Sequence, residues 1–187
     1  VVMVYASTSR VFKGDKAEPY SEDDAPEPLT HYGRTKHIGE IVAASLVEKH
    51  IVARTSWVFG GKAGQDTKFY GRVLQQLKSG QSEIVALNDV KGSPTYGKDY
   101  IAAIKTLLLE GRSGTFHIAN SGVATRYDLA LAMAEQVRPD AEVRAVDRSF
   151  FPSGPTLPAN ESITSKHLTL RPWQEALEEY LSGEWMS

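Results

Sequence analysis

The sequence predicts an α/β fold built on a largely parallel sheet. Short apolar runs of strand length alternate with longer amphipathic runs of helical length along most of the 187 residues. No internal repeat or low-complexity tract interrupts this alternation. Two stretches rich in proline or acidic residues, 13–30 and 148–165, are expected to be surface loops. Because ligands of open α/β sheets bind beyond the carboxyl ends of the strands, such loops are expected at the mouth of a site.

Each element follows from a local pattern. Strands are expected where short apolar runs end at turn-forming residues, at 1–6, 51–59, 83–87, 115–119 and 142–146. Helices are expected where apolar residues recur at every third or fourth position, at 31–49, 67–78, 99–109, 125–137 and from 172 onward. Gly80 ends the second of these helices, Thr125 with Asp128 is typical of a helix start, and Pro172 occupies a first turn. The first helix carries an apolar stripe formed by Ile38, Ile41, Val42 and Leu46.

Composition narrows the classes of function. A net charge of −2 leaves no basic footprint for nucleic acid. The absence of cysteine excludes disulfides and thiolate metal sites, and it fits a cytoplasmic protein. No apolar run reaches membrane-spanning length, and no signal peptide is recognisable. The chain opens at Val1 on a buried-strand pattern, which fits a short domain that begins at its first strand but favours the later part of a longer protein.

Tyr32 and Lys36 form the candidate chemical centre. Residues four apart share a helix face, and an ammonium beside a phenol favours the phenolate, which makes tyrosine an effective proton donor near neutral pH. Ser7 and Thr8 follow the first predicted strand, so hydroxyl, phenol and ammonium groups could converge on one carbonyl oxygen. Each piece alone has a plainer interpretation: a solvated helix face for the first pair and a strand-capping turn for the second.

The order and spacing of several motifs resemble the dTDP-4-dehydrorhamnose reductase family of the extended short-chain dehydrogenase/reductase superfamily. The matching stretches are Ser7-Thr8-x-x-Val11-Phe12-x-Gly14, Pro28-Leu29, Tyr32-Gly33, Lys36, Gly39-Glu40, Arg54-Thr55-Ser56-Trp57-Val58-Phe59-Gly60, Gly92-Ser93-Pro94-Thr95, Gly114-Thr115-Phe116-His117-Ile118-Ala119-Asn120-Ser121-Gly122 and Pro172-Trp173-Gln174-Glu175-Ala176-Leu177. The resemblance implies the later part of a Rossmann-like parallel sheet plus a smaller sugar-binding lobe. Residues 1–187 would form a partial NAD(P)-binding domain interleaved with a substrate lobe at roughly 60–100 and 140–187. About three βαβ units of roughly 30 residues each would precede Val1.

The resemblance also implies roles for individual residues. The family reduces a nucleotide-activated 4-keto-6-deoxysugar with NADPH or NADH. Its catalytic residues would be Thr8, which hydrogen-bonds the C4 oxygen, Tyr32, which protonates it, and Lys36, which holds the nicotinamide ribose. The cofactor would be contacted by Ser7, Tyr32 and Lys36, and the nucleotide-sugar substrate by Thr8, Arg10, Val11 and Trp57. On residue type alone Trp57 is also typical of a core tryptophan on a buried strand. Assembly into a homo-oligomer is compatible with the resemblance.

The sequence departs from the family pattern at several positions. Ser9 and Arg10 stand where the family has an acidic and an aromatic residue, and Leu157-Pro158 stands where it has Arg-Pro. The glycine-rich phosphate fingerprint is missing, since Gly60-Gly61-x-x-Gly64 follows a strand but is interpreted as a loop. Two alternatives therefore stay open: an epimerase or dehydratase of sugar nucleotides, and a non-catalytic binding or regulatory homologue with the same fold.

Overall fold

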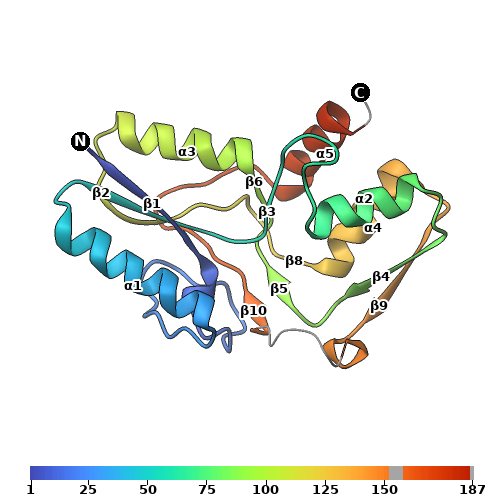
Figure 1. The fold of residues 1–187 in the computed structure, drawn as a ribbon, viewed down its shortest axis with the longest axis horizontal. Coiled ribbons are helices and arrows are strands. Elements are labelled where there is room, and N and C mark those ends of the chain that lie inside the picture. The colour runs from blue at the N-terminus through green and yellow to red at the C-terminus, as the bar shows by residue number, and fades with distance from the viewer. Residues whose placement is uncertain (152–157, 186–187) are drawn as a thin grey trace.

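The computed structural model describes residues 1–151 and 158–185, and its elements form two lobes (Figure 1). The first lobe consists of strands β1 (Met3–Thr8), β2 (His50–Thr55) and β7 (Gly114–His117) with helices α1 (His31–Leu46) and α3 (Gly97–Leu109) on opposite sides. The second lobe consists of helices α2 (Phe69–Lys78), α4 (Arg126–Val137) and α5 (Trp173–Glu184) with strands β4 (Glu83–Leu87) and β9 (Glu142–Val146). No helix of the described ranges is long and apolar enough to cross a membrane.

The sheet of the first lobe positions the candidate site. Its strands run parallel in the order β1-β2-β7, and Thr8 at the end of β1 pairs with Thr55 at the end of β2. The centre of β2 is buried because Ile51 and Ala53 pack against Leu107 of α3 and its neighbours. Parallel pairing brings the carboxyl ends of both strands to one edge of the sheet, where the residues that follow them meet.

The second lobe has its own core. Strand β4 pairs in parallel with β9, and α2, α4 and α5 supply fully buried side chains including Leu74, Met133 and Leu181. Helix α4 begins with the capping box formed by Thr125 and Asp128. The helix lies outside the ranges 60–100 and 140–187, although it packs in this lobe. Which parts of the chain bind cofactor and which bind substrate stays a prediction.

Two-residue strands connect the lobes. Strand β3 (Val58–Phe59) pairs in parallel with β6 (Thr95–Tyr96). Strand β5 (Lys91–Gly92) lies between β10 (Asn160–Glu161), which is parallel to it, and β8 (Ala124–Thr125), which is antiparallel. These pairings join segments that are far apart in the sequence, so they fix one lobe against the other.

The structure confirms the α/β class and most of the expected elements. The strand expected at 83–87 is β4, and the helix expected at 125–137 begins one residue later as α4. Helix α2 ends at Lys78, ahead of Gly80, whose φ of 94° suits a glycine at the end of a helix.

Two strand expectations need correction, and the buried face of α1 is a further finding. The single strand expected at 51–59 is wrong, because the chain turns at Trp57 and forms two strands, β2 and β3. The first strand, expected at 1–6, lies two residues later, at Met3–Thr8. Helix α1 buries Gly33, Glu40 and Ala43 against the sheet rather than its apolar stripe. The stripe of Ile38, Ile41, Val42 and Leu46 is exposed, with Leu46 78% accessible.

Candidate active site

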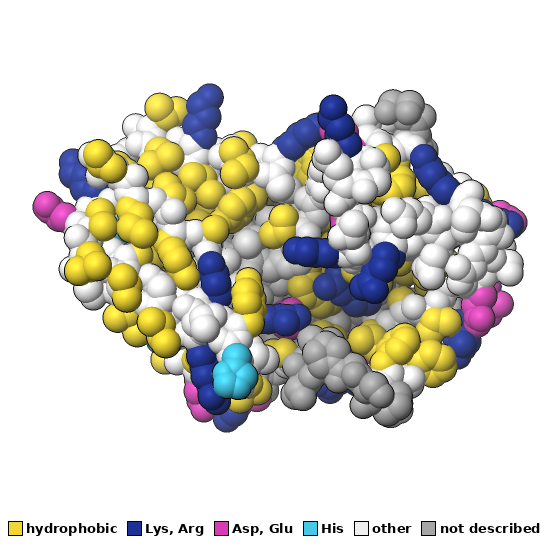
Figure 2. All heavy atoms as spheres, viewed as in Figure 1, with side chains coloured by type: hydrophobic (Ala, Val, Ile, Leu, Met, Phe, Trp, Pro, Cys, Tyr) yellow, Lys and Arg dark blue, Asp and Glu magenta, His cyan; other side chains and the backbone are white. Residues whose placement is uncertain are grey.

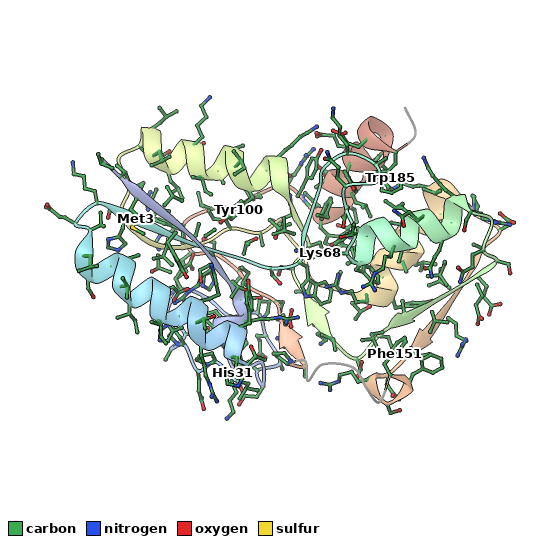
Figure 3. The ribbon with its side chains drawn as sticks, in the orientation of Figure 1. Met3, His31, Lys68, Tyr100, Phe151 and Trp185 are labelled. Atoms are coloured by element: carbon green, nitrogen blue, oxygen red, sulfur yellow. The ribbon has the colours of Figure 1, made fainter. Side chains whose placement is uncertain are left out.

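A cavity of about 340 Å³ opens at the carboxyl ends of β1 and β2, between the lobes. It brings together five residues to which the sequence analysis assigned roles: Ser7, Thr8, Arg10, Tyr32 and Trp57. Its other lining residues are Ser9, Thr55, Ser56, Val58, Lys68, Phe69, Tyr70, Arg126 and Glu161. Lys68, labelled near the centre of Figure 3, marks the side of the cavity formed by the second lobe.

Thr8 offers a hydrogen-bond donor of fixed position. It ends β1 and caps the short 3-10 turn Ser9–Val11, and its Oγ1 accepts a hydrogen bond from the backbone nitrogen of Arg10 at 3.3 Å. That bond uses an oxygen lone pair, so the hydroxyl hydrogen remains available to a ligand. A donor held in this way suits an oxygen on which negative charge develops.

Tyr32 lies in the first turn of α1, close to the turn that follows Thr8. The helix and the turn approach closely at Gly33, where any side chain would clash, because a Cβ atom would lie only 2.1 Å from the carbonyl oxygen of Arg10. The side chain of Tyr32 is 52% exposed, and its hydroxyl makes no hydrogen bond within the described ranges. Its phenol is therefore accessible to a substrate.

Lys36 is not among the residues that line the cavity. It follows Tyr32 by one helical turn, but its ammonium lies over the ring of Tyr5 on β1, 4.4 Å from the ring centroid. Tyr5 in turn contacts Gly39, where a Cβ atom would meet the Tyr5 hydroxyl at 2.0 Å. The structure thus brings Thr8 and Tyr32 to the cavity and leaves Lys36 beside it, against β1.

Ser7 lines the cavity and also belongs to a buried polar network. Its hydroxyl donates to Glu40 Oε1 at 2.5 Å, while Arg54 donates to both carboxylate oxygens at 2.8 and 2.7 Å. His37 Nδ1 lies 3.3 Å from Glu40 Oε2. Burial by itself raises the pKa of Glu40, but the hydrogen bonds from Arg54 and Ser7 outweigh it, and the pKa lies below its ordinary value. The network locks α1 to β1 and β2, and a cofactor contact by Ser7 stays a prediction.

Trp57 forms a wall of the cavity and is held on several sides. Its backbone adopts a φ of 38°, and its Nε1 donates to Glu161 Oε2 at 2.7 Å. Gly92 packs against the indole, since a Cβ atom there would lie 2.2 Å from Cε2. The guanidinium of Arg126 stacks on the ring at 3.8 Å from its centroid. Trp57 is therefore neither a fully buried core residue nor an open apolar platform.

Arg10 faces the same carboxylate as Trp57. Its Nε lies 3.0 Å from Glu161 Oε1, an ion pair whose geometry falls short of a hydrogen bond. The Glu161 side chain is only 3% exposed, so the pair is desolvated on the acidic side. A cation from residue 10 and a carboxylate from residue 161 thus complete one wall of the cavity.

The structure also keeps the Val11 side chain out of the cavity. Val11 is fully buried in a cluster with Phe12 and Tyr20, so the structure does not bring its side chain to a substrate. Leu157 lies outside the described residues, and Pro158 next to it packs against Gly14, where a Cβ atom would lie 2.2 Å from Pro158 Cβ.

The sequence did not identify Arg126 or Glu161, although both line the cavity. Glu161 lies in a two-residue strand within a segment expected to be irregular, and such a strand leaves no periodic pattern. Arg126 follows the capping Thr125 at the start of α4. A positive charge at the start of a helix is unfavourable because of the helix dipole. A cation at this predicted helix start was the sequence feature that could have marked Arg126 as functional.

Comparisons with known proteins agree on one family. A family model described as the RmlD substrate binding domain matches residues 1–184. The dTDP-4-dehydrorhamnose reductase of Mycolicibacterium smegmatis is 34% identical over 97% of this chain and 57% of its own length. The crystal structure of the dTDP-4-dehydrorhamnose reductase of Yersinia enterocolitica matches with a TM-score of 0.89 and 32% identity over 96% of this chain and 65% of that one.

A further solved relative was crystallised with a dinucleotide. The dTDP-4-dehydrorhamnose reductase of Bacillus anthracis, in complex with NADP, matches with a TM-score of 0.88 and 29% identity over 96% of this chain and 64% of that one. The first curated relatives are covered over only 57–63% of their own length. The chain therefore spans about three fifths of the proteins it resembles.

Proposed function

Because this chain belongs to the family of the RmlD substrate binding domain, we propose that it is the later part of an NAD(P)H-dependent reductase of a nucleotide-activated 4-keto-6-deoxysugar. The observation that carries the proposal is the shared cavity, on which a free Thr8 donor and an accessible Tyr32 phenol both open. The names of the relatives from M. smegmatis and Y. enterocolitica supply the reaction class.

In this proposal Tyr32 gives its hydroxyl proton to the C4 carbonyl oxygen while the carbonyl is reduced to an alcohol. The Thr8 hydroxyl donates to the same oxygen and stabilises the negative charge that develops there. The arrangement is supported by the close contact between Gly33 and Arg10, which holds the start of α1 against the turn after Thr8. Arg10 and Glu161 form one wall of the cavity in which the sugar would lie.

The donor set beside the cavity fits the ribose end of a nicotinamide dinucleotide. Lys36 has no carboxylate partner in the described part of the chain, and the Tyr32 hydroxyl is free there as well. These two residues would hold the nicotinamide ribose, and the nicotinamide supplies the hydride when it is bound. Lys36 would leave the ring of Tyr5 to reach a ribose hydroxyl. The pyrophosphate would be held by a glycine-rich unit that is expected upstream of Val1.

The proposal is tested in the protein extended upstream of Val1 to include that unit. Tyr32→Phe removes the proton donor but keeps the ring, so the turnover number should fall at least about a hundredfold, the usual scale for a general acid. NADPH consumption in the presence of a dTDP-4-keto-6-deoxysugar gives the rate, and the reduced sugar is identified by NMR.

A matched control is Tyr127→Phe, because Tyr127 packs against the core of the second lobe and does not line the cavity. Its turnover should stay near that of the unmodified protein. Near-normal turnover of Tyr32→Phe would sink the mechanism. Conversion of the sugar nucleotide without net consumption of NADPH would point to an epimerase or dehydratase instead.

A further inference from the structure

Arg126 lies where two cavities meet. One cavity contains Tyr32, and a second cavity of about 420 Å³ is formed by α2, β4 and Phe151. Among the described residues, only Phe69 and Arg126 line both. A ligand that extended from one cavity into the other would therefore pass Arg126. The junction comes from the start of α4 and the start of α2, so it belongs to the second lobe.

The guanidinium of Arg126 is oriented by two aromatic rings. Its carbon lies 3.8 Å from the Trp57 ring centroid and 4.6 Å from that of Phe69. Over residues 1–151 and 158–185 it makes no hydrogen bond and no ion pair. Burial lowers the pKa of Arg126, because a desolvated cation is unfavourable without a partner. A ligand that supplied two acceptor oxygens would relieve that cost, since the planar guanidinium binds phosphate in a bidentate manner.

The junction carries an excess of positive charge. Arg10, Lys68, Arg72 and Arg126 line the two cavities, whereas Glu161 is the single carboxylate among their described lining residues. Arg10 pairs with Glu161, but Lys68 and Arg72 form no ion pair in the described ranges. Basic side chains gather around the hollow in the middle of this face (Figure 2). The excess is local, since the whole chain has a net charge of −2.

The two cavities differ in chemistry. The first holds the hydroxyl and phenol groups that suit a keto sugar. The second is lined by Phe69, Val85, Leu87 and Phe151, with Gln76 as an uncharged polar group, and suits the flat apolar faces and polar edge of a nucleobase. In a nucleotide-linked sugar, the diphosphate lies between the sugar and the nucleoside that carries the base.

We propose that Arg126, assisted by Lys68 and Arg72, binds the diphosphate of the nucleotide-sugar at the junction of the two cavities. The inference rests on the proposed function and deepens it, because it assigns the residue that orients the substrate. The sugar would then extend toward Thr8 and Tyr32, and the nucleoside toward Gln76. Trp57 would serve chiefly to hold the guanidinium in place rather than to stack on the sugar.

Binding measurements on residues 1–187 test this inference without turnover. The probes are dTDP, which carries the diphosphate, and thymidine, which lacks it, and titration calorimetry gives both affinities. Arg126→Met keeps most of the side-chain length and removes the charge and the donors. Its affinity for dTDP should fall at least about tenfold, as expected for lost charged hydrogen bonds. Arg112→Met is the control, because Arg112 is exposed, pairs with Glu110 in the first lobe and lines neither cavity.

Two further variants cover the case in which Arg126→Met does not fold. Lys68→Met alters an exposed side chain and should weaken dTDP binding several-fold while leaving the melting temperature unchanged. Arg126→Lys keeps a cation without the bidentate fork and should give an intermediate affinity. Unchanged dTDP affinity in the folded Arg126 variants would overturn the inference, as would an unmodified chain that does not bind dTDP. An equal loss of thymidine affinity would also overturn it, because the defect would then not concern the anion.

Failure of the inference and failure of the proposed function give different results. If Tyr32→Phe retains turnover but Arg126→Met loses dTDP, the reduction mechanism is wrong and the diphosphate site stands. If dTDP affinity is unaffected by Arg126→Met while Tyr32→Phe is inactive, the reductase stands and the diphosphate is bound elsewhere.

Discussion

Trp57 has a left-handed backbone conformation, with φ at 38°, that residues other than glycine seldom adopt. Such strain persists only where the surroundings over-determine it, and here Glu161, Arg126 and Gly92 all fix the indole. The turn at Trp57 breaks the strand expected at 51–59 and directs the ring to the cavity. No local pattern in the sequence could show this, because each of these three partners of the indole lies at least 35 positions away along the chain.

Gly92→Ala tests how closely the indole depends on its neighbour. A Cβ atom at this position would lie 2.2 Å from the Trp57 ring, so the ring or the strand must shift. Overpacking of this kind should lower the free energy of unfolding by about 2 kcal/mol. Urea denaturation gives the value. Gly97→Ala is the matched control, because a Cβ atom there would come no nearer than 3.4 Å to the carbonyl oxygen of Phe59, an ordinary contact distance. Equal stability of the two variants would refute the restraint on Trp57.

At the scale of the element, α1 shows what sequence patterns can and cannot determine. The motif spacing identified the helix and put Thr8 and Tyr32 at one cavity, since both follow from strand and helix periodicity. The buried face of α1 could not be predicted, because it includes Glu40, a charged residue whose burial depends on its pairing with Arg54 of β2. Capping signals such as that of Thr125 act over three residues, and they were predicted correctly.

Glu40→Gln should destabilise the protein by about 3 kcal/mol near neutral pH, because it leaves the buried Arg54 without its charge partner. The pKa of Glu40 is depressed in the folded state, so its contribution is present above the ordinary value of 4.5 and is lost as pH falls through the folded pKa. The stability difference between the unmodified protein and the variant should therefore shrink below about pH 4. Thermal unfolding between pH 3 and 8 measures it.

Glu48→Gln supplies the comparison for that experiment, because Glu48 is exposed just beyond the end of the same helix. It should change stability by no more than about 0.5 kcal/mol at any pH. A difference for Glu40→Gln that stayed constant down to pH 3 would show that the carboxylate charge is not what stabilises the network.

At the scale of the whole molecule, one surface of the first lobe is unusually apolar. The stripe on α1 is exposed, and β1 is an edge strand of the described sheet order β1-β2-β7. Unpaired strand edges and contiguous apolar patches both recruit partners. The α/β class and the parallel sheet could be predicted from alternation of elements, but which faces remain uncovered depends on how the lobes pack.

Residues 1–187 should therefore associate with themselves in a concentration-dependent manner. Ile41→Glu places a charge in the middle of the stripe and should reduce the association at least about fivefold, as expected when a charge must be desolvated. Sedimentation velocity over a range of concentrations gives the dissociation constant. Val123→Glu is the control, because Val123 is also exposed but lies outside the stripe. A monomer at every concentration would contradict the expectation.

The ion pair between Arg10 and Glu161 also bears on the order in which the molecule folds. It joins positions 151 residues apart, and Ser56 and Trp57 are bound to the same late residue, by its carbonyl and its carboxylate respectively. Contacts between such distant parts of a chain form slowly, because the entropy of closing a long loop is lost before the contacts can stabilise the fold. During synthesis, the part of the cavity formed by Thr8 and Tyr32 would leave the ribosome early. The wall that contains Glu161 could form only after residue 161 had also left the ribosome. The cavity is thus among the last parts of this molecule to be completed as it folds.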